Sequence, residues 1–76
     1  MSNRNDNVFS PGSTEQENAG MEHATRYYAI RKELTRREVQ ESAEALILYF
    51  NKVGKSDFGI GFRRAAYLLA IGRGEQ

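Results

Sequence analysis

The sequence predicts a small all-α domain behind a disordered N-terminal arm. Three observations support this: apolar residues at helical spacing from Val39 to Val53, a capping box just before them, and a length of only 76 residues. A chain this short buries a small core, so oligomerisation or a partner often adds stability. We expect one helical domain over residues 13–76, with two or three helices arranged as a hairpin and a crossing N-terminal helix.

The N-terminal arm and the first helix are distinguished by composition. Residues 1–12 are polar and end at a Pro-Gly break, a composition that cannot offset the entropy of ordering. Ser13, with Gln16 three residues later, predicts a capping box that opens a helix ending at about Leu34. Gly20 weakens its first half by about 1 kcal/mol relative to alanine. Its apolar residues form a modest stripe: Ala24, Tyr27, Tyr28, Ile30 and Leu34.

The second helix has the clearest pattern in the chain. Thr35 and Glu38 predict a reciprocal capping box, and Gly54 predicts a left-handed residue just after the helix, which we place at residues 36–53. Its apolar seam consists of Val39, Ala43, Leu46, Phe50 and Val53. The end of this helix, LILYF at residues 46–50, is apolar all round and must be covered on several sides.

A third helix follows a glycine-rich segment. Ser56 or Asp57 is its candidate N-cap, but Gly59 and Gly61 delay the expected start to about Phe62. The predicted core stripe contains Phe58, Phe62, Ala65 and Leu69, widened by Tyr67, Leu68 and Ile71. We expect an antiparallel hairpin of the second and third helices, in which these residues meet near the turn: Phe50, Val53, Phe58 and Phe62.

The aromatic content favours a role in protein–protein contact. Aromatic residues make up 11% of the chain, and tyrosine and arginine are enriched at interface hot spots. We predict a small non-enzymatic accessory or regulatory protein, acting as a homodimer or as an inhibitor or adaptor of a larger protein. The candidate interface residues are Tyr27, Tyr28, Arg31, Ile47, Leu48, Tyr49 and Tyr67. Equally, each tyrosine fits a seam between helices, with its hydroxyl reaching solvent.

The alternative function is nucleic-acid binding through a basic surface around the second and third helices. Residues 1–24 carry one basic and four acidic residues, whereas residues 25–76 carry ten basic and six acidic residues. The candidate nucleic-acid or anion contacts are Arg36, Arg37, Lys55, Arg63 and Arg64. Against a helix-turn-helix, the expected connection over residues 54–61 is long, and the third helix lacks the Asn, Gln, Ser or Thr that read base edges. An ordinary solvated basic face fits the same residues.

Catalytic and metal sites have little support in the sequence. His23 is the single histidine and there is no cysteine, so we expect no catalytic residue, metal, cofactor or small-molecule substrate. Gly54-Lys55-Ser56 resembles the end of a P-loop, but Tyr49 stands where that motif needs glycine. No apolar stretch approaches 20 residues and the N-terminus has no signal-peptide pattern, so we expect a cytoplasmic protein without membrane contact.

Overall fold

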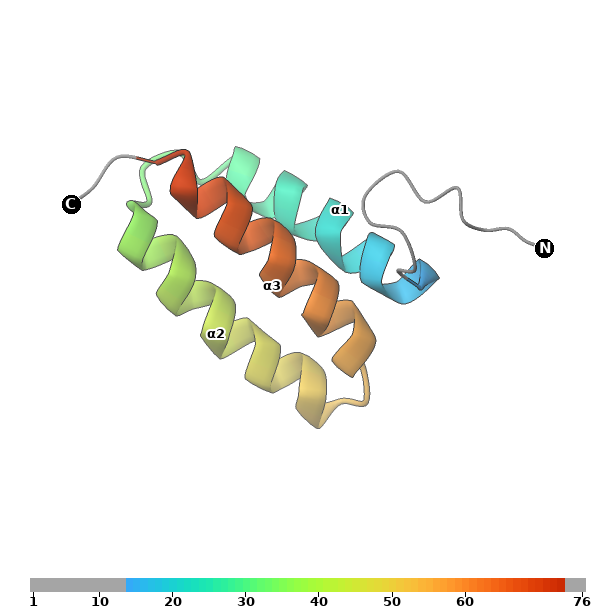
Figure 1. The fold of residues 1–76 in the computed structure, drawn as a ribbon. Coiled ribbons are helices and arrows are strands. Elements are labelled where there is room, and N and C mark those ends of the chain that lie inside the picture. Colours follow the sequence, from blue (N-terminus) through green and yellow to red (C-terminus); the bar gives the residue numbers. More distant parts are fainter. Residues whose placement is uncertain (1–13, 74–76) are drawn as a thin grey trace.

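The computed structural model describes residues 14–73, which form three helices with α3 lying between α1 and α2 (Figure 1). The helices are α1 (Glu15–Ala29), α2 (Arg36–Lys52) and α3 (Ser56–Ile71). The predicted all-α class is confirmed. Within the described residues, no helix is both long and apolar enough to cross a bilayer. The arm predicted over residues 1–12 lies outside the described range.

The first helix is shorter than the sequence predicted. Its capping box is Thr14 with Glu17, not Ser13 with Gln16: the Thr14 hydroxyl accepts from the Glu17 N–H at 3.1 Å, and the Glu17 carboxylate accepts from the Thr14 N–H at 3.2 Å. Ser13 itself lies outside the described residues. The helix ends at Ala29 rather than near Leu34, because a turn over residues 31–34 leads directly into the second helix.

A distant arginine closes the end of α1. The Arg73 guanidinium, just beyond α3, donates to the carbonyl oxygens of Tyr28 at 2.9 Å, Arg31 at 3.1 Å and Leu34 at 2.6 Å. A cation at the C-terminal end of a helix interacts favourably with the helix dipole. Arg73 therefore ties the end of α1 and the turn that follows it to the C-terminal end of α3.

The turn between α2 and α3 has only three residues, 53–55, which corrects the long connection expected from the sequence. The predicted capping box of Thr35 and Glu38 is confirmed, and Gly54 has the predicted left-handed φ of 80°. The Gly54 N–H donates to the Asn51 carbonyl at 3.3 Å and the Lys55 N–H to the Phe50 carbonyl at 2.7 Å, which is a Schellman motif.

The third helix begins at Ser56, six residues before the predicted start at Phe62, and includes both glycines that were expected to delay it. Lys55 is its N-cap, without a side-chain cap bond, so neither Ser56 nor Asp57 has the predicted capping role. Glycine is needed at position 61 of the helix because Gly61 lies against the backbone of α1. A Cβ at this position would be 2.8 Å from the Glu17 Cα, closer than real Cβ atoms approach.

The close approach of α1 and α3 shapes the core. A Cβ at Gly20 would lie 2.8 Å from the Phe62 nitrogen, so the two helices meet backbone to backbone at Gly20 and Gly61. They run in the same direction, since Gly61 adjoins Glu17 and Arg73 reaches Tyr28. The core beside this contact is built largely from small side chains: Met21, Ala24, Tyr28, Val39, Ala43, Phe62, Ala65, Ala66 and Ala70.

An aromatic cluster packs between α2 and α3. The Phe50 ring lies 5.0 Å from the Phe58 ring and 5.4 Å from the Phe62 ring, between ring centroids, as the hairpin prediction expects. Val53 does not join them: it is the C-cap of α2 and 45% exposed. The two helices are antiparallel and side by side (Figure 1).

Candidate functional site

α3 is apolar on two opposite faces, and only one of them is buried. Leu68 and Ile71 are each 63% exposed and Ile60 is 45% exposed, although the sequence placed Leu68 and Ile71 in a widened core stripe. At 100° per residue these side chains lie across the helix from Phe62, which is fully buried. α1 and α2 cover the Phe62 side, and no other element within residues 14–73 covers the opposite side.

This open side carries a shallow groove of about 410 Å³, which we call the outer groove. It is lined by Ile60, Arg63, Arg64, Tyr67, Leu68 and Ile71. All six residues come from α3, and they combine apolar side chains with two guanidinium groups and no carboxylate. The outer groove is therefore an apolar surface with a positive charge in its middle.

A carboxylate from α2 borders the outer groove. Arg63 Nε lies 3.3 Å from a Glu44 carboxylate oxygen, and the Tyr67 hydroxyl donates to the same oxygen. That hydrogen bond is the main reason why the pKa of Tyr67 is raised. The Arg63 guanidinium also lies 5.5 Å from the Tyr67 ring centroid. These contacts orient Arg63 and Tyr67 along the side of the groove nearest α2.

The predicted interface residues of α2 and Tyr67 differ in their exposure to solvent. Leu48 is 71% exposed and Tyr49 is 58% exposed, so the apolar end of α2 is open to solvent on that side. Ile47 is half-buried, and a Cβ at Gly59 would lie 3.8 Å from its Cγ2. Tyr67 is half-buried in the outer groove.

The predicted interface residues of the α1 region are engaged within the domain. Tyr28 is fully buried, with its hydroxyl 2.6 Å from Ser42 Oγ and 3.3 Å from the Val39 carbonyl oxygen. Burial raises the pKa of Tyr28, and the Ser42 hydrogen bond partly opposes this rise. Tyr27 is half-buried, and the Arg31 guanidinium stacks 3.6 Å above its ring while donating to the Tyr27 carbonyl at 3.0 Å. Tyr28 thus belongs to the core rather than to a surface.

The predicted nucleic-acid contacts lie at different places along the hairpin. Arg36 donates to the Ile71 carbonyl oxygen at 3.3 Å, at the C-terminal end of α3, with Arg37 next to it on α2. Lys55 lies at the opposite end, its ammonium 6.0 Å from the Phe58 ring centroid. Among the five candidates the outer groove brings together only Arg63 and Arg64. Nucleic-acid binding stays a prediction from the sequence.

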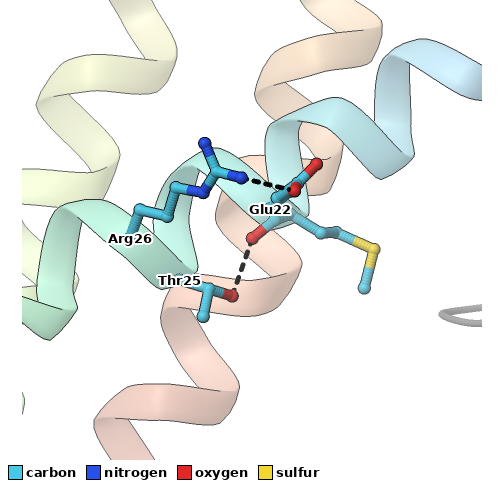
Figure 2. Close-up of polar contacts among 4 residues, drawn as sticks. Glu22, Thr25 and Arg26 are labelled. Carbon is cyan, nitrogen blue, oxygen red and sulfur yellow. Dashed lines mark hydrogen bonds and ion pairs between the residues drawn. The ribbon is translucent and has the colours of Figure 1, made fainter.

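Polar side chains on the exposed side of α1 bond to other groups of the same helix. Arg26 donates to the Glu22 carboxylate at 2.9 Å, and the Thr25 hydroxyl donates to the Met21 carbonyl at 2.9 Å. Figure 2 shows these two bonds on α1. His23 is exposed, with its ring centroid 5.6 Å from that of Phe58. Within residues 14–73 no cluster of three His, Cys, Asp or Glu side chains is arranged to hold a metal ion.

Comparisons with known proteins give no relative. The chain matches no protein-family model, no curated protein and no solved structure. The chemistry of the outer groove is therefore inferred from its own residues. Sequence reasoning identified Tyr67, Arg63 and Arg64 but assigned Leu68 and Ile71 to the core. The spacing of Ile60, Leu68 and Ile71 on one side of a helix was the signal that could have identified the groove.

Proposed function

We propose that this protein is a small non-enzymatic accessory or regulatory protein that acts through protein–protein contacts at the outer groove. It acts as a homodimer, or as an inhibitor or adaptor of a larger protein. The observation that supports this proposal is the exposure of Ile60, Leu68 and Ile71 along one side of a helix whose other face already forms the core. Exposed apolar side chains that gather on one face of a small domain are typical of an interaction site. We also propose that the protein is cytoplasmic, as expected from the sequence.

The energy available at this surface limits the kind of contact. Full burial of a leucine or isoleucine side chain contributes roughly 1.5–3 kcal/mol, so covering the exposed parts of these three contributes roughly 3–5 kcal/mol. Association costs at least about 4 kcal/mol in lost translational and rotational freedom. Apolar burial in the groove therefore does little more than offset that cost. A stable complex also requires polar contacts, and Arg63 and Arg64 are placed to supply them.

The proposal is tested by affinity capture from source-cell extract, with the tagged full chain as bait. The wild type is compared with Leu68→Gln/Ile71→Gln and with the control Ala45→Gln, which changes an exposed position of α2. Quantitative mass spectrometry follows captured proteins, and sedimentation velocity follows self-association. We expect a partner, or a dimer, that the control retains and the groove variant loses. A strictly monomeric chain without a partner, or a partner captured equally by all three proteins, would contradict the proposal.

A further inference from the structure

We propose that the outer groove binds a second copy of this chain, with the two α3 helices antiparallel about a two-fold axis. This inference rests on the proposed function and names the partner and its orientation. Three properties of the groove support it: the spacing of its residues, the side chains that this spacing pairs, and the apolar area that two copies bury together.

The middle of the outer groove follows a helix-pairing pattern. Its residues are Ile60, Arg64, Tyr67 and Ile71, spaced four, three and four apart, with Leu68 beside them. At 100° per residue the four side chains lie within about 60° of one another around α3. The spacing is the same when it is followed from either end. A two-fold interface requires this property, because every contact between the copies is also made in reverse.

Antiparallel alignment of this pattern on itself pairs compatible side chains. Ile60 of each copy lies opposite Ile71 of the other, so that two isoleucine pairs close the two ends of the contact. Nearer the axis, the Arg64 side chain of each copy lies opposite the Tyr67 ring of the other. Arginine side chains pack favourably on tyrosine rings. In a parallel pair each residue would instead meet its own copy, and both kinds of contact would be lost.

The arginine residues of the groove are compatible with this pairing. Arg63 lies at the edge of the pattern and is paired within its own copy, where its Nε lies 3.3 Å from a Glu44 carboxylate oxygen. Arg64 likewise has an interaction within its own chain. The part of Arg64 that the pairing uses is its aliphatic stem, which can cover an aromatic surface while the guanidinium group stays near solvent.

A second copy also supplies the apolar area that a stable contact requires. Burial of Ile60, Leu68 and Ile71 of one copy does little more than offset the cost of association, as estimated above. In the two-fold pair both copies bury these three side chains. The apolar burial therefore doubles, whereas the loss of translational and rotational freedom occurs once.

Disulfide trapping tests the partner and its orientation together, because the chain contains no cysteine. In the antiparallel pair, position 60 faces position 71 of the second copy, whereas the two positions 60 are about 16 Å apart along the helices. A disulfide requires Cα atoms within about 7 Å of each other. Under mild oxidation, an equimolar mixture of Ile60→Cys and Ile71→Cys should therefore form at least about tenfold more disulfide-linked dimer than either variant alone. The control Ala45→Cys, on the exposed side of α2, should form only the background amount.

Sedimentation equilibrium of the full chain gives an independent measurement. We expect a monomer–dimer equilibrium that Ile71→Gln weakens at least about hundredfold, because a two-fold contact loses the side chain twice and each loss costs about tenfold. The control Ala45→Gln should change the dissociation constant by less than about threefold. Ile71 is mostly exposed in the single chain, so the variant should fold, and circular dichroism of each variant checks this.

Other results would overturn the inference. A strictly monomeric wild type contradicts it, as does a dimer that Ile71→Gln leaves unchanged. A disulfide that Ile60→Cys forms alone as readily as in the mixture indicates a parallel pair and also contradicts it. If a larger protein is captured from extract through the groove while the purified chain stays monomeric, the proposed function stands and this inference fails.

Discussion

Replacing Gly61 with alanine should destabilise the domain, although Gly61 lies within a helix and alanine is the better helix former. A Cβ at Gly61 would sit 2.5 Å from the Glu17 carbonyl carbon, whereas ordinary contact begins near 3.4 Å. The atoms in the way belong to the backbone of α1, so no side-chain rotation relieves the overlap. The two helices must therefore move apart by about 1 Å along their contact, a shift that forfeits a quarter to a half of the dispersion energy there.

The expected change in the free energy of unfolding for Gly61→Ala follows from two opposing effects. Alanine in place of glycine improves helix propensity by about 1 kcal/mol. Forcing extra atoms into a packed contact typically costs about 1–3 kcal/mol. Here the cost should be at or above the upper end of that range, because the backbone of α3 lies directly against the backbone of α1. We expect Gly61→Ala to lower the free energy of unfolding by about 2 kcal/mol. For a domain of this size that corresponds to a fall in Tm of roughly 8–16 °C.

Gly59→Ala is the matched control for this prediction. Gly59 is also buried in α3, but a Cβ there would lie 3.3 Å from the Phe50 Cβ, so α2 would need to shift by only a few tenths of an ångström. The gain in propensity should then nearly balance the contact, with a net change below about 1 kcal/mol. Urea and thermal unfolding followed by circular dichroism at 222 nm measure both variants. If Gly61→Ala proves as stable as Gly59→Ala, the backbone contact of α1 and α3 does not exist as described.

Four further predictions concern other contacts. Arg73→Ala should lower the free energy of unfolding by about 2 kcal/mol in urea titrations, because it removes charged hydrogen bonds to three carbonyl groups; an unchanged midpoint would contradict this. Thr35→Ala should cost about 1 kcal/mol in the same assay through loss of its cap. Tyr28→Phe should cost about 1 kcal/mol at pH 7. The raised pKa means that folded Tyr28 holds its proton more tightly than the unfolded chain, so wild-type stability present below pH 10.0 should fall above it, more steeply than in Tyr28→Phe. In sedimentation velocity, Leu48→Ser should weaken any self-association that uses the exposed end of α2.

The parts of the fold that local chemistry determines were predictable from the sequence. The start of α2 follows from the reciprocal bonds of Thr35 and Glu38, and its end follows from Gly54, whose φ of 80° suits glycine. These signals act within a few residues. The end of α1 and the turn after it are different, because Arg73 contacts them from 39 to 45 residues away and leaves no local mark in the sequence.

The start of α3 and the outer groove were predicted wrongly for the same physical reason. Gly59 and Gly61 each disfavour a helix by about 1 kcal/mol, and only the packing of α1 and α2 against them shows why they belong in one. The candidate site was hidden for a similar reason. Ile60, Leu68 and Ile71 are as apolar as the residues on the buried side of α3, so composition could not decide which face the other helices cover.

Site-specific cross-linking shows directly whether the outer groove contacts another protein. A photoreactive benzoylphenylalanine replaces Leu68 in one protein and Ala45 in another, both at exposed positions, and each is irradiated in source-cell extract. We predict a discrete cross-linked product from position 68 whose yield far exceeds that from position 45. Equal yields from both positions, or no product from position 68, would contradict the claim.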